Sequence, residues 1–495
     1  MIPETLREAA RRFGDSVAYV TPNGWPITYA ELDRTSDEVA AGLVRRGVAV
    51  GDVVSLVLPP GIEYLVAYLA VAKVGAITAG VNDKLAAPER AKILDLAGPV
   101  LVLAAPGSAD SPFATEEYAP AESIDAMLVG LRVAGGAPPA LPDDPDRAVA
   151  IVFTSGTTGT PKGALYGNRQ LRFITDTDVG DAWGSGGKSY NGTSSATLGF
   201  MSKLPGNLRR GGTAFMMARW SARATLELIA RERMTSIGGV PTQLALMLRD
   251  PDFDAYDLTS VRAIISGGAP MTPSLAEEAR ARFHAPLATR YSCTEAGIGL
   301  GTAFDDPDED AIVSVGRPLP GVELALLDDD DRPVATGAVG AVCLRSAATM
   351  TGYWRDPEAT RAAFTDDGFV RTGDLGWVDD HGRLRLVGRH KEMYVRGGYN
   401  VYPVEVEAVL STAPDVAAVA IATRPDEVMG EIGVACVVPR DPAAPPTLEQ
   451  LRAFAGDQLA KHKLPEAVVV VDALPLTAAE KVDRRALHRL ANPDA

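Results

Sequence analysis

The sequence is poor in cysteine and histidine, which several enzyme classes need. Of its 495 residues only three are cysteines, Cys293, Cys343 and Cys436, too far apart for a CxxC metal site or a disulfide framework. The five histidines all lie in the second half of the chain and show no metal-ligand spacing. These shortages argue against a zinc hydrolase, a histidine-based triad and a disulfide-rich secreted protein.

Long apolar runs and positive charge are also scarce. Runs such as 467–471 are far too short to cross a bilayer, and residues 1–5 have no signal-peptide character. The 48 Lys and Arg stand against 64 Asp and Glu, and the resulting net charge of −16 argues against a nucleic-acid partner. We therefore expect a cytoplasmic protein without a membrane span. We interpret the acidic clusters at 305–310 and 328–331 as solvated turns.

Hydrophobic residues, in contrast, are abundant at 46%, and the length exceeds one ordinary core. Strand-like runs alternate with helical periodicity up to residue 283, which predicts mainly parallel sheets covered on both faces. Shorter strands and turns beyond 311 predict a β-rich subdomain. We predict an α/β fold with a large multi-layer N-terminal domain over 1–389 and a small α+β domain over 390–495.

The expected elements follow from these patterns. Predicted helices cover 4–13, 29–47, 62–75, 88–97, 221–233, 241–249, 273–283, 403–411 and 447–460. Predicted strands cover 18–20, 27–29, 53–58, 75–81, 100–104, 148–152, 214–217, 236–240, 263–265, 322–327, 339–345, 369–371, 376–378, 384–387, 416–422, 432–438 and 467–472. The stretch 180–193 has little periodicity, and we expect a loop there.

The most informative stretch is 153–163, Phe-Thr-Ser-Gly-Thr-Thr-Gly-Thr-Pro-Lys-Gly, directly after a strand-like run. Its glycines permit a concave backbone, its hydroxyls can donate to phosphate oxygens, and Lys162 adds a positive charge. It differs from the GxxxxGK[ST] loop because Gly163 follows the lysine. The residues alone predict a loop that binds ATP or another phosphate.

Further motifs follow this loop in order. They are Tyr291-Ser292-Cys293-Thr294-Glu295, Gly352-Tyr353-Trp354, Thr372-Gly373-Asp374, Gly388–Glu392, Gly397–Glu407, and Leu474–Thr477 with Lys481. Together they resemble the acyl-adenylate-forming (ANL) superfamily, which includes acyl- and aryl-CoA synthetases, peptide-synthetase adenylation domains and luciferases. The resemblance implies two steps. A carboxylate attacks the α-phosphate of ATP to give acyl-AMP and pyrophosphate, and a thiol then displaces AMP.

The resemblance also assigns site residues. Those for ATP or AMP are Thr154, Ser155, Gly156, Thr157, Thr158, Gly159, Gly268, Ala269, Tyr291, Asp374 and Arg389. Among these, Tyr291 would stack on adenine and Asp374 would accept hydrogen bonds from ribose. The catalytic residues would be Lys481, Glu295, Thr294 and Lys162, with Glu295 also holding Mg²⁺ and Lys481 bridging the carboxylate and the α-phosphate.

The resemblance also assigns residues to a hinge between the two domains and to the binding of CoA and of the acyl group. Lys391 would be the hinge, and Gly397 and Gly398 would border a pantetheine tunnel, although a plain turn also explains the two glycines. The acyl pocket would be formed by Leu198, Gly199, Phe200, Gly239, Val240, Gly267 and Cys293. ATP, Mg²⁺ and CoA are the implied cofactors.

The chain departs from the family pattern in ways that limit the prediction. Glu480 stands before Lys481, where glycine is usual, and 194–200 lacks the frequent histidine of the acyl-pocket segment. That segment also lacks the aspartate of amino-acid-activating domains, which favours a carboxylate that is not an amino acid. The residues of the predicted pocket are small and carry few charges, so we expect an apolar aryl, alicyclic or medium-length acyl group. Alternatives to CoA transfer are a carrier-protein pantetheine, a non-thiol nucleophile, or a nucleotide-binding regulator without catalysis. A homodimer is one option for the assembly.

Overall fold

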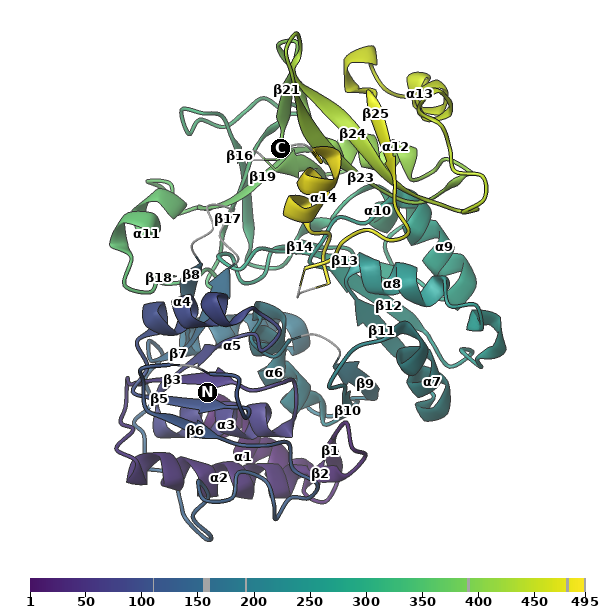
Figure 1. Cartoon of the computed structure of the whole chain (residues 1–495). Helices are drawn as coiled ribbons and strands as arrows, with labels where there is room; N and C mark the ends of the chain where they lie inside the picture. The colour runs from purple at the N-terminus through teal and green to yellow at the C-terminus, as the bar shows by residue number, and fades with distance from the viewer. Residues whose placement is uncertain (110, 155–160, 192–193, 390–391, 478–479, 494–495) are drawn as a thin grey trace.

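The largest sheet contains the strand that leads into the predicted phosphate-binding loop (Figure 1). The computed structural model describes every residue except 110, 155–160, 192–193, 390–391, 478–479 and 494–495. In the described part this sheet has seven strands in the order β18-β8-β7-β4-β3-β5-β6. They are β3 Val53–Val57, β4 Ile77–Gly80, β5 Leu101–Ala104, β6 Thr115–Glu117, β7 Ala148–Thr154, β8 Lys162–Gly167 and β18 Gly352–Tyr353. β7 pairs parallel with β4 and antiparallel with β8, so the two strands that flank residues 155–160 are neighbours in the sheet.

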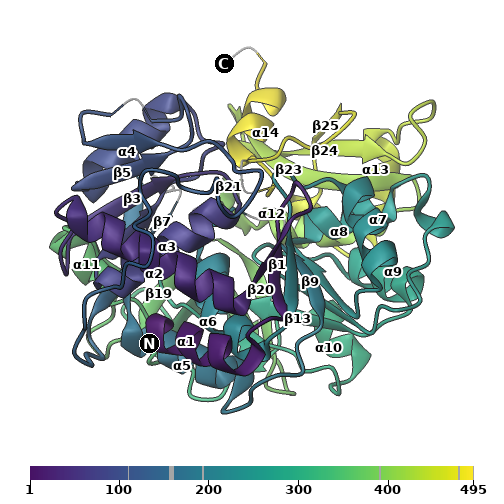
Figure 2. The same cartoon turned by 90° about the horizontal axis from the view of Figure 1, so that it is seen from below.

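Helices near the N-terminus cover this sheet. They are α1 Ile2–Phe13, α2 Tyr29–Arg45, α3 Ile62–Val74 and α4 Ala87–Ala97, and α1 to α3 pack side by side (Figure 2). Every residue of α3 is buried, because the helix is apolar on all sides and lies between the sheet and α2. Its buried Lys73 forms an ion pair with Asp33 at 2.6 Å, which offsets the cost of burying the charge.

A second sheet has the order β2-β1-β10-β9 in the described residues. Its strands are β1 Val17–Val20, β2 Pro26–Thr28, β9 Lys188–Asn191 and β10 Thr213–Met216. The strands predicted at 18–20 and 27–29 are found as β1 and β2, which pair antiparallel. The expectation of a loop throughout 180–193 is wrong, because β9 pairs in parallel with β10. β9 is a polar edge strand, Lys-Ser-Tyr-Asn, so it lacks the apolar alternation that identifies a strand in the sequence.

The third sheet, β11-β12-β13-β14-β15, packs against helices of the chain's middle part. Its strands are β11 Ser236–Gly239, β12 Ala263–Gly267, β13 Leu287–Tyr291, β14 Leu300–Gly301 and β15 Arg317–Pro318. The helices around it are α7 Ala222–Glu232, α8 Pro241–Leu248, η1 Phe253–Ala255, α9 Pro273–Phe283 and α10 Asp308–Val313. Two further helices, α5 Asn168–Val179 and α6 Leu198–Arg210, contact each other and pack on the core of the largest sheet. The predicted α9 is found at its predicted bounds. α5 and α6 were not predicted, and α6 contains Gly199, Pro205 and Gly206, which are weak helix formers.

The fourth sheet is the predicted β-rich unit, in the order β16-β17-β19-β20. Its strands are β16 Glu323–Leu327, β17 Gly340–Arg345, β19 Val370–Val378 and β20 Leu384–Arg389, with α11 Pro357–Ala363 nearby. The prediction of separate strands at 369–371 and 376–378 is wrong, because β19 is continuous. Its pairing with β17 is irregular between Ala341 and Cys343, and Gly373 adopts a φ of 79° within the bulge. The apparent turn at Gly373 is therefore a bulge within one strand.

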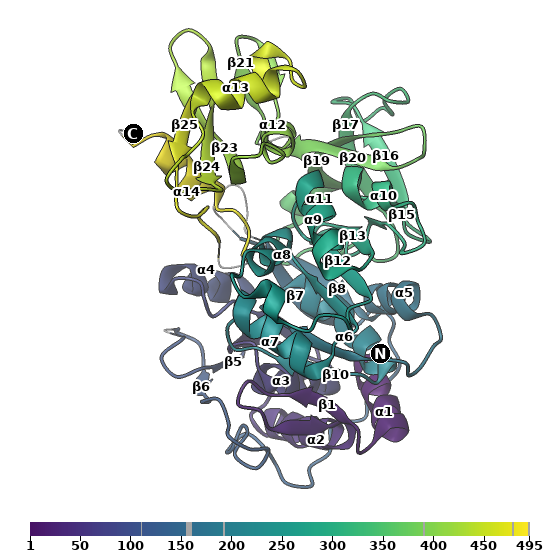
Figure 3. The ribbon, with the colours of Figure 1, turned by 90° about the vertical axis from the view of Figure 1, so that its right-hand side faces the viewer.

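The last sheet belongs to the C-terminal part and has its own apolar core. It contains β21 Tyr394–Arg396, β22 Tyr399–Val401, β23 Val416–Asp426, β24 Gly430–Pro439 and β25 Ala467–Val470. The helices here are α12 Pro403–Leu410, α13 Leu448–Gly456, η2 Lys461–Lys463 and α14 Arg484–Ala491. In Figure 3 the C-terminal part, coloured green to yellow, lies at the top of the view, above α8 and α9. None of the helices in the described residues combines the length and apolar composition that a membrane span requires.

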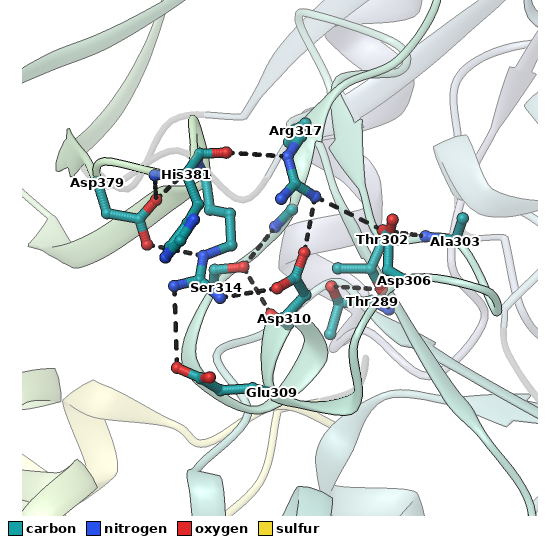
Figure 4. Close-up of polar contacts among 12 residues, drawn as sticks. Thr289, Thr302, Ala303, Asp306, Glu309, Asp310, Ser314, Arg317, Asp379 and His381 are labelled. Carbon is teal, nitrogen blue, oxygen red and sulfur yellow. Dashed lines mark hydrogen bonds and ion pairs between the residues drawn. The ribbon is translucent and has the colours of Figure 1, made fainter.

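The interpretation of 305–310 as a solvated turn is wrong for its last residue. Asp310 lies on α10 and is buried, and its carboxylate accepts hydrogen bonds from Arg317 at 2.7 Å and from Arg383 at 2.7 Å. Arg383 also donates to Asp379 at 2.7 Å. Figure 4 shows Asp310 with Arg317, and Asp379 nearby. The arginines that neutralise Asp310 come later in the chain, so the acidic run by itself looks like a surface turn.

Candidate active site

Three parallel strands end beside one another and bring together segments that the sequence separates. β11, β12 and β13 pair in register, so Gly239, Gly267 and Tyr291 lie at the same edge of the sheet. The carboxyl ends of parallel strands are the usual place for ligand sites in such sheets. A Cβ on Gly267 would lie 2.4 Å from the carbonyl oxygen of Arg290, so glycine is required there. The predicted Val240, Gly268 and Ala269 follow directly at this edge.

Asp374 sits in a network with the two other residues predicted around the nucleoside. Tyr291 donates from Oη to Asp374 Oδ2 at 2.7 Å, and Arg389 donates from Nε to Oδ1 at 3.0 Å. Asp374 is only 8% exposed. Burial raises the pKa of Tyr291 well above its ordinary value, and the charge of Asp374 raises it further. Tyr291 therefore remains a neutral donor, and Asp374 remains an acceptor with lone pairs left for a ribose hydroxyl.

Glu295 and Thr294 are fixed by tyrosines from the large sheet. Tyr353 donates from Oη to Glu295 Oε1 at 2.7 Å, and the ring of Tyr353 lies 5.0 Å from Lys162 Nζ. Tyr166 on β8 donates to the backbone carbonyl oxygen of Thr294. Burial raises the pKa of Tyr353, and the charge of Glu295 raises it further, so the hydroxyl stays protonated. One tyrosine thus links the predicted phosphate-binding lysine to the predicted metal ligand.

The oxygen donors at this position suit Mg²⁺. No cluster of three or more His, Cys, Asp or Glu side chains with metal-binding geometry occurs in the described residues. Magnesium is commonly held by one or two carboxylates together with substrate phosphates. A carboxylate has acceptor capacity beyond one hydrogen bond, so Glu295 can serve Tyr353 and a cation together.

Lys481 reaches this site from the C-terminal part. A Cβ built on Gly268 would lie 4.0 Å from Lys481 Nζ, so the ammonium group lies over the turn after β12. The Lys481 side chain is open to water but has protein on several sides. The surrounding protein lowers the pKa of Lys481, the positive charge of Arg389 lowers it further, and Asp374 opposes the shift. The structure therefore brings together Lys481, Gly268, Asp374 and Arg389.

The glycine pair predicted to border a pantetheine tunnel forms a hairpin turn. Gly397 and Gly398 have φ values of 54° and 85° and join the paired residues Arg396 and Tyr399 of β21 and β22. Two positive φ angles in a two-residue loop are typical of a type I′ turn, which favours glycine. The turn by itself explains the two glycines in this conformation, and the tunnel stays a prediction.

Part of the predicted acyl pocket lies in the main core. Phe200, on α6, is 9% exposed, and its ring packs edge-on against Tyr64 and Tyr68 of α3 at 5.5 Å each. Leu198 also packs against this core. A small cavity adjoins this region, and its lining residues are Tyr64, Tyr68, Thr78, Gly80, Ala150, Ile151, Val152, Ser195, Ala196, Thr197 and Met201. Sequence reasoning had proposed a wall from 197–200 but gave no role to α3.

The other predicted pocket residues lie near the sheet edge. A Cβ on Gly239 would lie 2.5 Å from Oε1 of Gln243, so the missing side chain makes room for that amide. Burial raises the pKa of the Cys293 thiol, and the charge of Glu295 raises it further, so Cys293 is not a thiolate nucleophile. Ser155, Gly156, Thr157, Thr158, Gly159 and Lys391 fall outside the described residues.

Sequence reasoning missed three residues of this site. Tyr353 belongs to a motif that was noted without a role, and Tyr166 lies in the segment after the phosphate loop. Gln243 lies on α8 and carries no local signal, because only its contacts across the fold distinguish it.

Comparison with known proteins supplies an independent finding. Residues 6–354 match the family model described as AMP-binding enzyme, and residues 405–481 match its C-terminal domain. The fatty acid–[acyl-carrier-protein] ligase ScoC of Streptomyces coeruleorubidus is 33% identical over 489 residues, which cover 94% of this chain and 92% of ScoC. The long-chain-fatty-acid–CoA ligase FadD13 of Mycobacterium tuberculosis is 32% identical over 503 residues, which cover 98% and 97%. The structure of the amide bond synthetase McbA of Marinactinospora thermotolerans superposes with a TM-score of 0.86 at 30% identity and covers 99% of each chain.

Proposed function

The chain belongs to the AMP-binding enzyme family and is an AMP-forming ligase; from this premise we propose that it transfers an activated acyl group to the thiol of CoA. In the first step a carboxylate attacks the α-phosphate of ATP, which forms acyl-AMP and releases pyrophosphate. In the second step the CoA sulfur attacks the acyl carbon and AMP leaves. CoA is thus a substrate, which corrects its grouping with the cofactors. The proposal divides the chain into an adenylate-forming domain, 1–389, and a mobile domain, 390–495.

The observation that supports the proposal most is the approach of Lys481 to the nucleotide-binding residues. Both reactants of the first step are anionic, so positive charge at the point of attack lowers the barrier. Lys481 lies over Gly268 and close enough to Asp374 and Arg389 for their charges to act on it. A lysine from the C-terminal part at this position can contact both the carboxylate and the α-phosphate.

The remaining residues bind and orient the nucleotide in this proposal. Asp374 accepts hydrogen bonds from the ribose hydroxyls, while Tyr291 and Arg389 hold its carboxylate. Thr294 contacts the α-phosphate, and the loop from Thr154 to Lys162 clasps the β- and γ-phosphates. Glu295 would hold Mg²⁺, which supplies positive charge to the phosphate oxygens when bound.

The molecule that accepts the acyl group is the least constrained part of the proposal. The similarity to a ligase named for an acyl carrier protein and to an amide bond synthetase keeps two alternatives open, a carrier-protein pantetheine and a nitrogen nucleophile. The acid is proposed to be apolar, with an aryl, alicyclic or medium-length acyl group. A cytoplasmic location belongs to the same proposal, because the three cysteines are free thiols and a reducing compartment keeps them so. A homodimer stays a prediction that light scattering can check.

A pyrophosphate-release screen with and without CoA tests the proposal. Purified protein with ATP and Mg²⁺ is offered aliphatic, aromatic and polycyclic acids, and products are identified by mass spectrometry. We expect acid-dependent pyrophosphate release and acyl-CoA formation. Accumulation of acyl-AMP without consumption of CoA would contradict CoA as the acceptor, and absence of release with every acid would contradict adenylation of these acid classes.

A further inference from the structure

Lys481 ends the segment 477–481, here called the Lys481 loop, and an unusual residue, Glu480, directly precedes it. Thr477 and Lys481 close the loop, because Thr477 N donates to Lys481 O at 2.7 Å and Glu480 N donates to Thr477 O at 2.9 Å. The flanking residues Leu476 and Val482 form a β-bridge. Glu480 has a φ of 61°, the left-handed conformation that glycine adopts most easily. A glutamate therefore occupies a position where the backbone conformation favours glycine. Contacts of its side chain must offset the conformational free energy that the positive φ costs.

The side chain of Glu480 makes a contact across the site. Gln243 Nε2 donates to Glu480 Oε2 at 2.5 Å. The other end of the same amide, Gln243 Oε1, accepts from the backbone N–H of Val240 at 3.2 Å. Gln243 is 1% exposed and lies in the first turn of α8, so its amide is held in place. Glu480 is thereby connected through one amide to the segment Gly239-Val240.

We propose that Glu480 is a positioning residue that latches the Lys481 loop to the start of α8 during adenylation and releases it for acyl transfer. The proposal rests on the proposed function, in which Lys481 acts in the first step only. A hydrogen bond between a fixed buried amide and a carboxylate is stronger than one between neutral groups. It holds the neighbouring Lys481 over Gly268, where the Lys481 Nζ is observed. Because the latch touches the predicted wall of the acyl pocket, the acid and the lysine are positioned by the same element.

The first test removes the Glu480 carboxylate but keeps a residue for which the left-handed backbone conformation is unfavourable. Glu480→Ala leaves a side chain at a positive φ but removes the acceptor. We expect pyrophosphate release to slow about tenfold, as for loss of a charge-assisted hydrogen bond. Thioester formation from supplied acyl-AMP should be unchanged or faster. Glu427→Ala, at an exposed glutamate between β23 and β24, is the matched control and should alter neither step.

Glu480→Gly distinguishes the effect of the Glu480 side-chain hydrogen bond from the effect of its backbone conformation. Glycine relieves the left-handed conformation, so a purely conformational role predicts adenylation equal to or faster than that of the native enzyme. The latch predicts a loss similar to that of Glu480→Ala. Adenylation at the native rate in Glu480→Gly would overturn the proposal.

An exchange of donor and acceptor gives the sharpest test. Gln243→Glu keeps an oxygen for the Val240 N–H but sets two carboxylates against each other, so adenylation should fall more than tenfold. Adding Glu480→Gln restores a hydrogen bond with reversed polarity, and we expect most of the lost rate to return. Failure of the double variant to recover, with an unfolding temperature equal to that of the single variants, would overturn the latch.

Hydrogen exchange of the 474–483 segment tests the latch independently of catalysis. We expect faster exchange in Glu480→Ala and Gln243→Glu than in the native enzyme, and restored protection in the double variant. This readout needs no substrate, so it distinguishes failure of the latch from failure of the proposed reaction. Unchanged exchange in all variants would contradict the inference even if the enzyme is a CoA ligase.

Discussion

Two tyrosine hydroxyls orient the carboxylates of the site. Tyr291 donates to Asp374 and Tyr353 donates to Glu295, at 2.7 Å in both cases. Tyr291 is buried and Tyr353 is half-buried, and the pKa of each is raised, so each can donate but does not ionise near neutral pH. The ribose-binding role proposed for Asp374 and the Mg²⁺-binding role proposed for Glu295 therefore depend on these neighbouring hydroxyls.

Tyr353→Phe removes one of these donors while keeping the ring beside Lys162. We expect kcat/KM for ATP with Mg²⁺ to fall about tenfold, because a hydrogen bond to a charged group is lost. Steady-state pyrophosphate release measures the effect. Tyr256→Phe, at a half-buried tyrosine after η1, is the control and should leave kcat/KM as it was. An unchanged value in Tyr353→Phe would show that Glu295 does not need this donor.

Lys481→Ala tests the lysine assignment. Loss of a positive charge that acts on the attacking carboxylate and the α-phosphate should slow adenylation by about 10²–10³-fold. Thioester formation from supplied acyl-AMP should continue, because the second step does not use this charge. Adenylation at the native rate would refute the assignment.

At the scale of secondary-structure elements, buried ion pairs join segments that are distant in the chain. Asp310 on α10, Arg317 on β15 and Arg383 before β20 form one network with Asp379. Burial alone would raise the pKa of Asp310, but hydrogen bonds from Arg383 and Arg317 lower it below its ordinary value. The network therefore ties the third sheet to the fourth in the ionised state.

Asp310→Asn should destabilise the fold, because it removes the buried carboxylate that Arg383 and Arg317 share and leaves only Asp379 as a buried partner of Arg383. Removing one member of a buried pair costs about 3–5 kcal/mol of unfolding free energy. Urea unfolding followed by circular dichroism measures it. The control is Asp330→Asn, which breaks the exposed pair with Arg332 and should cost less than about 1 kcal/mol. Equal effects of the two substitutions would contradict a structural role for the network.

The same network predicts acid sensitivity. A carboxyl group whose pKa is lower in the folded than in the unfolded state stabilises the fold above its unfolded pKa, and this stabilisation is lost as pH falls through the folded pKa. For Asp310 and Asp379, both with lowered pKa values, the loss begins below about pH 4. Native protein should therefore lose more unfolding free energy between pH 5 and pH 3 than Asp310→Asn does. A parallel decline in both proteins would exclude Asp310 as a source of the pH dependence.

At the scale of the whole molecule, the C-terminal part rests on α8 and α9 through few polar contacts in the described residues. Ser274 at the start of α9 donates to the carbonyl of Ser411 at 3.3 Å, and Arg249 after α8 donates to the carbonyl of Ala417. With the bond between Gln243 and Glu480, these contacts hold the arrangement that places Lys481 in the site. So small a number of hydrogen bonds is compatible with domain movement between the two steps.

A disulfide across this contact tests whether movement is required. The hydroxyl oxygens of Ser274 and Ser411 are 3.4 Å apart, so the two side chains face each other and Ser274→Cys with Ser411→Cys brings two thiols together across the contact. Oxidised protein should still form acyl-AMP, while thioester formation should fall at least tenfold and return on reduction. Thioester formation at the native rate in the cross-linked protein would exclude domain rotation as a requirement.

The sequence by itself determined what depends on local order. Helix α9 is found at its predicted bounds, because apolar spacing, Pro273 at the start and Thr272 as cap are all local signals. The alternation of strands and helices and the fixed order of motifs were enough for the fold class and the reaction class. Elements with weak local signals, such as the polar edge strand β9 and the Gly- and Pro-containing α6, were missed.

Only the tertiary structure decided which residues act together. The acidic run at 305–310 was misread because Arg317 and Arg383 neutralise Asp310 from other elements. Glu480 appeared only as a departure before Lys481, and its partner Gln243 lies 237 residues away. Pairing at that distance is set by how sheets and helices pack, and a single sequence carries no local periodicity or composition that records it.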